Sequence, residues 1–145
     1  MFTHLLLAVD GSPLSDAAFQ KALLLAQEMN ARITALRVGP KYHVFAYHTE
    51  MLSDARELFA EEIADSAKKY LERIALDAAA AGVTCETTFL IEDLPYEAII
   101  KTAEDRGCDL IVMASHGRRG VQGVLIGSET QKVLTHSKVP VLVYR

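Results

Sequence analysis

Glycine and arginine residues are concentrated in residues 113–134, MASHGRRGVQGVLIGSETQKVL, where the glycines stand at positions 117, 120, 123 and 127. Backbone N–H groups that point to one place bind an anion, and glycine permits the close approach and unusual dihedral angles that this requires. The spacing is neither that of a Walker loop nor that of a GxGxxG loop. Two interpretations are therefore open. The segment cradles a phosphate group, or it connects two elements and ends in a capping box formed by Ser128 and Gln131.

Apolar runs and amphipathic runs alternate along the chain and must position this loop. The runs 5–9, 32–38, 83–91, 110–113 and 139–143 predict five strands, and the first of them is continuously apolar. Apolar residues at helical spacing predict four helices over 12–30, 53–81, 95–106 and 128–137. This order predicts one α/β domain over residues 1–145, with a parallel sheet covered by helices on both faces. Ligands of such sheets bind beyond the carboxyl ends of the strands, which directs attention to Asp10, Val38 and residues 114–130.

The composition excludes several classes of protein. Of the 145 residues, 50% are hydrophobic and 23% are charged, so a folded globular domain is expected. The net charge of -4 argues against a protein that neutralises nucleic-acid phosphates. No apolar stretch is long enough to span a membrane, no signal peptide is recognisable, and we expect a cytoplasmic protein. Cys85 and Cys108 lack the spacing of a metal site and are interpreted as buried thiols.

Two groups of histidines invite a chemical interpretation. His43 and His48 lie in residues 41–52, an aperiodic segment rich in aromatic residues. They are five residues apart, so they would not lie on one helix face, and no third metal ligand is near. A segment of this length is more typical of a lid or a surface for a protein partner. His116 is a candidate general base, yet no nucleophile or second orienting group accompanies it. We therefore predict no catalytic residue and no dedicated metal site.

Residues 114–128 resemble the motif of the universal stress protein family. Its nucleotide-binding members carry Gly, two residues, Gly, nine residues, then Gly and Ser or Thr. This chain has Ala114, Ser115, His116, Gly117, nine residues from Arg118 to Ile126, and Gly127 with Ser128. The opening AVDGSPLSDAA, the segment CDLIVMASHGR and the closing VPVLV extend the resemblance over the whole chain.

The resemblance implies a Rossmann-like sheet of strand order 3-2-1-4-5 and an adenine nucleotide, ATP, across the ends of strands 1 and 4, with Mg or Mn bound through its phosphates. Ala8 and Asp10 would border the adenosine, and the backbone of Val38 would contact the adenine edge. The residues placed around the ribose and phosphates are Ala114, Ser115, His116, Gly117, Arg118, Gly127, Ser128, Glu129 and Thr130. It also implies a homodimer paired through the last strand, from Val139 to Val143, which would otherwise be an exposed edge.

The sequence departs from the family motif at Ala114, where a methyl group replaces the first glycine. If that position needs a positive φ or a close backbone contact with the ligand, nucleotide affinity is reduced or lost. A second departure is the acidic pair Glu92 and Asp93, where relatives often have glycine near the adenosine. Asp10 has two open roles: it contacts ribose, adenine or a divalent ion, or it accepts N–H bonds in an Asp-Gly turn.

Three functions follow from these observations. The first is a stress-response or signalling module that binds ATP and acts as a dimer. The second is a dimeric interaction protein of the same fold that binds no nucleotide. The third and weakest is a slow ATPase.

Overall fold

The computed structural model describes residues 1–41, 50–117 and 126–145, and of residues 50–53 only the helical backbone. Most of the expected partner surface at 41–52 lies outside these ranges, including His43 and His48. Arg118, Gly120 and Gly123 of the glycine loop also lie outside them.

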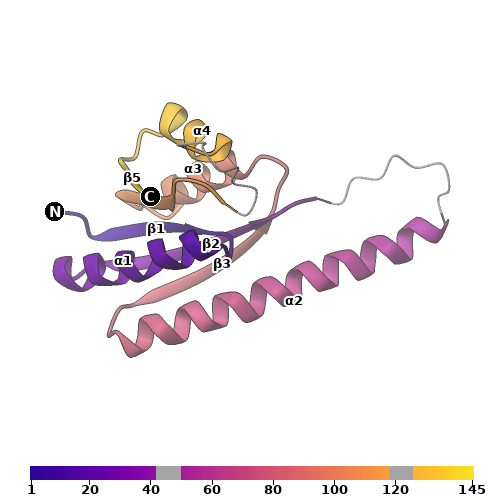
Figure 1. The fold of residues 1–145 in the computed structure, drawn as a ribbon, viewed down its shortest axis with the longest axis horizontal. Helices are drawn as coiled ribbons and strands as arrows, with labels where there is room; N and C mark the ends of the chain where they lie inside the picture. Colours follow the sequence, from indigo (N-terminus) through magenta and orange to yellow (C-terminus); the bar gives the residue numbers. More distant parts are fainter. Residues whose placement is uncertain (42–49, 118–125) are drawn as a thin grey trace.

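Five parallel strands form the sheet, in the order β3-β2-β1-β4-β5 (Figure 1). The strands are β1 (His4–Val9), β2 (Arg32–Gly39), β3 (Cys85–Ile91), β4 (Leu110–Ala114) and β5 (Val141–Tyr144). The order reverses between β1 and β4, which is where the sheet opens a crevice at its carboxyl end. The predicted α/β class and strand order are confirmed.

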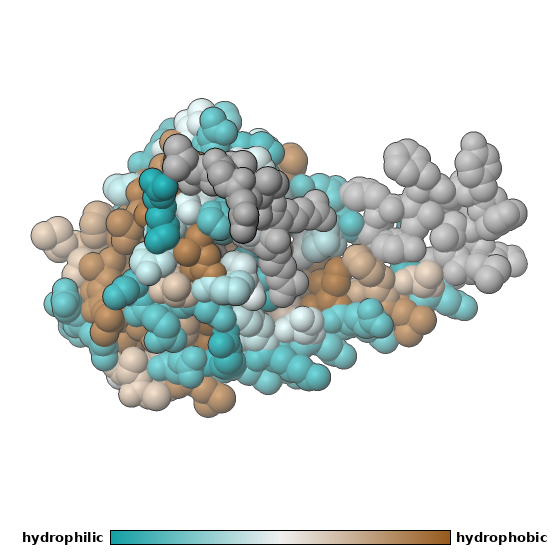
Figure 2. Space-filling model, in the orientation of Figure 1, coloured by the Kyte–Doolittle hydropathy of each residue, from teal (hydrophilic) through white to brown (hydrophobic). Residues whose placement is uncertain are grey.

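Four helices cover the sheet in two layers (Figure 1). They are α1 (Pro13–Met29), α2 (Glu50–Ala80), α3 (Pro95–Asp105) and α4 (Ser128–His136). The alternation of strand side chains builds two cores: Leu5 and Leu7 pack under α1 and α2, whereas Leu6 packs under α3 and α4. The long α2 extends past the strands, and much of the surface over it is hydrophilic (Figure 2). No helix among the described residues is long and apolar enough to cross a membrane.

The first helix begins and ends as the sequence predicts. The Ser12 hydroxyl accepts the N–H of Ser15 at 3.2 Å, and Pro13 occupies the first helical position. Asn30 closes the helix in the left-handed conformation, with φ 52°.

Several predicted boundaries were wrong for local reasons. The helix α2 begins at Glu50, before Ser53, because Glu, Met and Leu at 50–52 favour helix. The strand β3 begins after Val83, since the N–H of Val83 donates to Ala78 O and closes the preceding helix. The last strand begins at Val141 rather than Val139, because the Ser137 hydroxyl bonds both the N–H and the carbonyl of Val139 and holds a turn.

A buried histidine lies at the amino end of the sheet, opposite the crevice. His4 is 5% exposed, and its Nε2 lies 2.8 Å from the Thr34 hydroxyl. Its Nδ1 has no hydrogen-bond partner among the described residues. Burial lowers the pKa of His4, and Arg32 lowers it further, against the opposing effect of Asp109.

Candidate functional site

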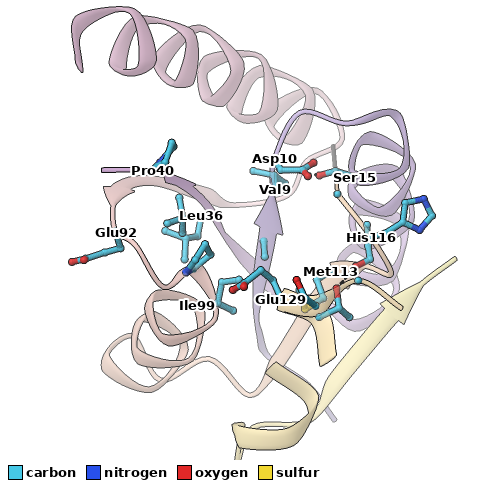
Figure 3. Close-up of a pocket in the computed structure, with 18 of the residues that line it drawn as sticks. Val9, Asp10, Ser15, Leu36, Pro40, Glu92, Ile99, Met113, His116 and Glu129 are labelled. Atoms are coloured by element: carbon cyan, nitrogen blue, oxygen red, sulfur yellow. Dashed lines mark hydrogen bonds between the residues drawn. The ribbon is translucent and has the colours of Figure 1, made fainter. Parts of the chain in front are cut away.

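A cavity of about 940 Å³ opens at the carboxyl ends of β1, β2 and β4, within the size range of small-molecule sites (Figure 3). Strands, the first turns of α3 and α4, and the connections after β1, β2 and β3 contribute to its wall. The lining residues are Ala8, Val9, Asp10, Ser15, Leu36, Val38, Pro40, Lys41, Glu92, Asp93, Pro95, Ile99, Met113, Ala114, His116, Gly117, Gly127, Ser128, Glu129 and Thr130.

The structure brings together the predicted site residues except two. Arg118 lies outside the described residues, and Ser115 does not line the cavity. Ser115 is 1% exposed and joins the elements behind the wall: its N–H donates to Tyr144 O at 2.7 Å, and its carbonyl accepts the N–H of Gly127 at 2.6 Å. It therefore holds β5 and the start of α4 against the end of β4.

An apolar slot forms one side of the cavity and was missed by the sequence analysis. The slot is lined by Leu36, Ile99, Met113 and Pro40, and Figure 3 shows Leu36 and Ile99 on the same side of the cavity. Leu36 and Met113 belong to the core on the α3 and α4 side of the sheet. The alternation of side chains along the predicted strands was the signal that would have assigned Leu36 and Met113 to the same face as Ala8.

Asp10 makes the turn that follows β1. Its Oδ1 accepts the N–H of Ser12 at 2.9 Å, and Gly11 has φ 77°, so the Asp-Gly turn is present. A Cβ placed at Gly117 would overlap Asp10 Oδ2. Glycine at 117 therefore gives the carboxylate its place beside the loop, which is a steric requirement that the sequence pattern alone does not reveal.

The first turn of α4 lacks the capping box that was one of the two open interpretations of this segment. Gly127 is the N-cap residue, because its carbonyl accepts the first helical N–H, from Gln131, at 2.9 Å. Glycine has no side chain that could cap the helix. Ser128 is consequently the first helical residue and is exposed. The N–H groups of residues 128–130 precede that first intrahelical bond, so no carbonyl within the helix accepts them. A helix end of this kind, on a cavity wall, suits an anion.

The carboxylate of Glu129 connects the two helices that flank the slot. Its Oε2 accepts the N–H of Tyr96, in the first turn of α3, at 3.0 Å, and its Oε1 lies 3.0 Å from Lys132 Nζ. Because Leu94 at the N-cap of α3 has no side-chain cap bond, Glu129 supplies the acceptor from the neighbouring helix. This role was not predicted from sequence.

Charged groups surround the cavity mouth. Lys41 pairs with Glu92 at 2.9 Å, and this hydrogen bond raises the pKa of Lys41. The pairing offsets one of the two carboxylates of the acidic pair at 92 and 93. The imidazole of His116 points away from the slot (Figure 3), with Nδ1 3.2 Å from the Ser115 hydroxyl. The general-base hypothesis for His116 gains no second catalytic group from this arrangement.

Other reactive groups lie away from the cavity wall. Among the described residues, no three of His, Cys, Asp and Glu are grouped closely enough to hold a metal ion. Both cysteines are free, and burial raises the pKa of Cys85 to about 11 and that of Cys108 above its ordinary value.

Comparison with known proteins gives one consistent family. The model of the universal stress protein family matches residues 1–145. The chain belongs to the universal stress protein family. It is 34% identical over 149 residues to universal stress protein YxiE from Bacillus subtilis, covering all of both chains. It superposes on universal stress protein UspA from Lactobacillus plantarum with a TM-score of 0.87, at 29% identity, covering 99% of this chain and 98% of the other.

Two further universal stress proteins share the fold and have been solved with nucleotides. One, in complex with cAMP, has a TM-score of 0.66 at 22% identity and covers 99% of this chain and 97% of its own. The other, from Archaeoglobus fulgidus in complex with dAMP, has a TM-score of 0.66 at 16% identity and covers 100% and 98%.

Ala114 stands where the resemblance to nucleotide-binding universal stress proteins leads us to expect glycine. It is the last residue of β4, and the only described non-glycine residue with positive φ is Asn30. Strand alternation places the Ala114 methyl on the face of Leu110 and Val112, which pack in the α1 core and not in the slot. The backbone at 114 therefore does not require glycine.

Proposed function

We propose that this universal stress protein binds an adenine nucleotide in the cavity and acts as a stress-response or signalling module. The observation that carries the proposal is the pairing of two features in one wall. An apolar slot of Leu36 and Ile99 suits a flat base, and the first turn of α4 beside Gly117 suits a phosphate.

The residues present fit such a ligand in chemical type. The slot would hold the base, with the backbone of Val38 at its polar edge. The N–H groups of residues 128–130 would receive phosphate oxygens, and Gly117 leaves backbone accessible beside them. The universal stress proteins solved with cAMP and dAMP support an adenine nucleotide as the class of ligand.

We propose ATP, with Mg or Mn bound through its phosphates, as the nucleotide. Asp10, Glu92, Asp93 and Glu129 give the described wall an excess of carboxylates over Lys41. A divalent cation would offset the charge of the phosphates next to these groups. ATP affinity should therefore depend on the cation more strongly than the affinity for AMP does.

We further propose that the protein acts as a homodimer through β5. This strand is at the edge of the sheet, and Leu142 on it is 46% exposed. An edge strand with an exposed apolar side chain favours pairing with a second copy. Both cysteines are free thiols, which supports a cytoplasmic setting.

The test is to denature the purified protein, identify any released nucleotide by mass analysis, and titrate the stripped protein with ATP and AMP. We expect adenine nucleotide in the released fraction or saturable binding below millimolar concentration. No released nucleotide together with no binding at millimolar ATP would refute the proposal. That result would favour the alternative function, a dimeric interaction protein that binds no nucleotide. Measuring phosphate release in the same samples tests the slow ATPase.

The variant Gly117→Val links binding to the cavity. Its side chain would displace the Asp10 carboxylate, so binding should be lost while the circular dichroism spectrum is unchanged. The matched control is Gly107→Ala, at the end of α3 with φ 64° and outside the cavity. This control should reduce stability by about 1 kcal/mol without changing affinity. Equal affinity in Gly117→Val and wild type would mean that the site is elsewhere.

A further inference from the structure

A chain of polar contacts leads from the cavity wall, through the adjacent α1 residues Ser15 and Asp16, to the middle of α2. It begins at the Asp10 turn, whose backbone N–H donates to the Ser15 hydroxyl at 3.2 Å. Ser15 is 2% exposed and itself lines the cavity, next to Asp10 in Figure 3. The hydroxyl thus takes part in the wall and holds the backbone of the turn.

The chain continues through Tyr70 on α2. The Tyr70 hydroxyl donates to Asp16 Oδ1 at 2.6 Å, and Arg73 Nη2 donates to the same oxygen at 2.8 Å. Burial and then the hydrogen bond to Asp16 raise the pKa of Tyr70 to about 12. Ser15 and Asp16 are neighbours in α1, so the Tyr70 phenol anchors this helix at the residue that directly follows the wall residue.

Two guanidinium groups fix the ring that carries this hydroxyl. Arg37 of β2 and Arg73 of α2 lie over the Tyr70 ring, at 5.1 and 4.9 Å from its centroid. The ring therefore has polar partners from β2, α1 and α2. A second link between α1 and α2, from Gln27 Nε2 to Ala81 O at 2.6 Å, is far from the cavity and offers a comparison.

We propose that the hydroxyls of Ser15 and Tyr70 are positioning groups that hold the Asp10 turn in the cavity wall and couple this wall to α2. The inference rests on the proposed function for its ligand. A nucleotide bound against the Asp10 turn then stabilises the middle of α2. Through α2, nucleotide binding also affects the part of the helix that extends beyond the sheet.

The experiment compares Tyr70→Phe, Ser15→Ala and Gln27→Ala with wild type by amide hydrogen exchange, with and without saturating ATP. Tyr70→Phe keeps the ring and its arginine contacts and removes only the hydroxyl. Without nucleotide, it should raise exchange at residues 10–12 and 66–74, whereas Gln27→Ala should raise exchange only near residue 81. With ATP, wild type should gain protection at 66–74, and Tyr70→Phe should lose this gain.

Affinity gives the readout that separates positioning from stability. Tyr70→Phe and Ser15→Ala should each weaken ATP binding about three- to tenfold, as expected for a hydrogen bond that orders one wall. The double variant should be no weaker than either single variant, because the two hydroxyls act in one chain. Gln27→Ala should leave affinity unchanged even where it lowers the melting temperature.

Two results would overturn the inference. One is unchanged exchange at residues 10–12 in Tyr70→Phe, and the other is additive losses of affinity in the double variant. The comparison without nucleotide keeps this inference separate from the proposed function. If wild type binds no nucleotide but Tyr70→Phe loosens residues 10–12, the function is wrong and the positioning role stands. If Tyr70→Phe does not fold, Asp16→Ala removes the acceptor of the same contact.

Discussion

Replacing Ala114 by glycine would restore the motif of nucleotide-binding universal stress proteins, and we expect it to bring no gain in affinity. The position is the last of β4 and has no positive φ, and strand alternation puts its methyl group on the side of Leu110 and Val112, although the residue itself borders the cavity. The contact that Ala114 makes with α4 is through its carbonyl, which accepts the Thr130 hydroxyl at 3.0 Å and is present in either variant.

Stability should change instead. Ala114 is 7% exposed, so the substitution removes a buried methyl group worth about 0.8 kcal/mol. Glycine in a strand adds an entropic cost of about 0.5–1 kcal/mol. The free energy of unfolding should fall by about 1.5 kcal/mol, which lowers the melting temperature by roughly 5 °C for a chain of this size.

The assay combines calorimetric titration with ATP and thermal unfolding without ligand. The matched control is Ala35→Gly, which removes a fully buried methyl from β2 on the α1 and α2 side, away from the cavity. Both variants should lose similar stability and keep wild-type affinity. A contrasting variant, Ala8→Gly, removes a methyl on the slot side and should alter affinity.

An increase of fivefold or more in affinity for Ala114→Gly, with an unchanged melting temperature, would refute this reasoning. It would mean that the methyl group obstructs the nucleotide and that the strand geometry at 114 changes when the ligand binds.

Three further predictions concern stability. Burial lowers the pKa of His4 below its ordinary value of 6.5, so below pH 6.5 the unfolded chain binds a proton at His4 more readily than the folded chain does. The free energy of unfolding therefore falls as the pH drops below 6.5. Urea titrations at pH 7.5 and 5.5 should show a larger loss for wild type than for His4→Gln, and equal losses would contradict the assignment. Thr130→Val should cost about 1 kcal/mol in thermal unfolding, since the buried carbonyl at the end of β4 loses its donor. The exposed Thr135→Val should cost less, and a reversed order would be inconsistent with this bond. Glu129→Ala should cost about 1 kcal/mol and raise amide exchange at Tyr96, the first-turn donor of α3; unchanged exchange there would show that this cap is unimportant.

Much of the fold was predictable because local signals agree with it. The proline after Ser12, the left-handed residue at Asn30 and the apolar strands gave element types and order. Boundaries failed where a local hydrogen bond decided them, as at Val83 and Val139, because hydrophobic periodicity does not reveal such a bond. The capping box failed because one carbonyl, that of Gly127, sets where α4 begins.

The sequence by itself determined the alternation of elements, the family, and the set of loops that meet at the carboxyl edge of the sheet. These follow from hydrophobic period, turn residues and motif spacing, which are properties of neighbouring positions. Only the tertiary structure decided that Ala114 has no positive φ, that Gly117 makes room for Asp10, and that the Tyr70 hydroxyl bonds Asp16, 54 residues away along the chain. Such contacts depend on how separate elements pack, and no local pattern in the chain encodes that distance.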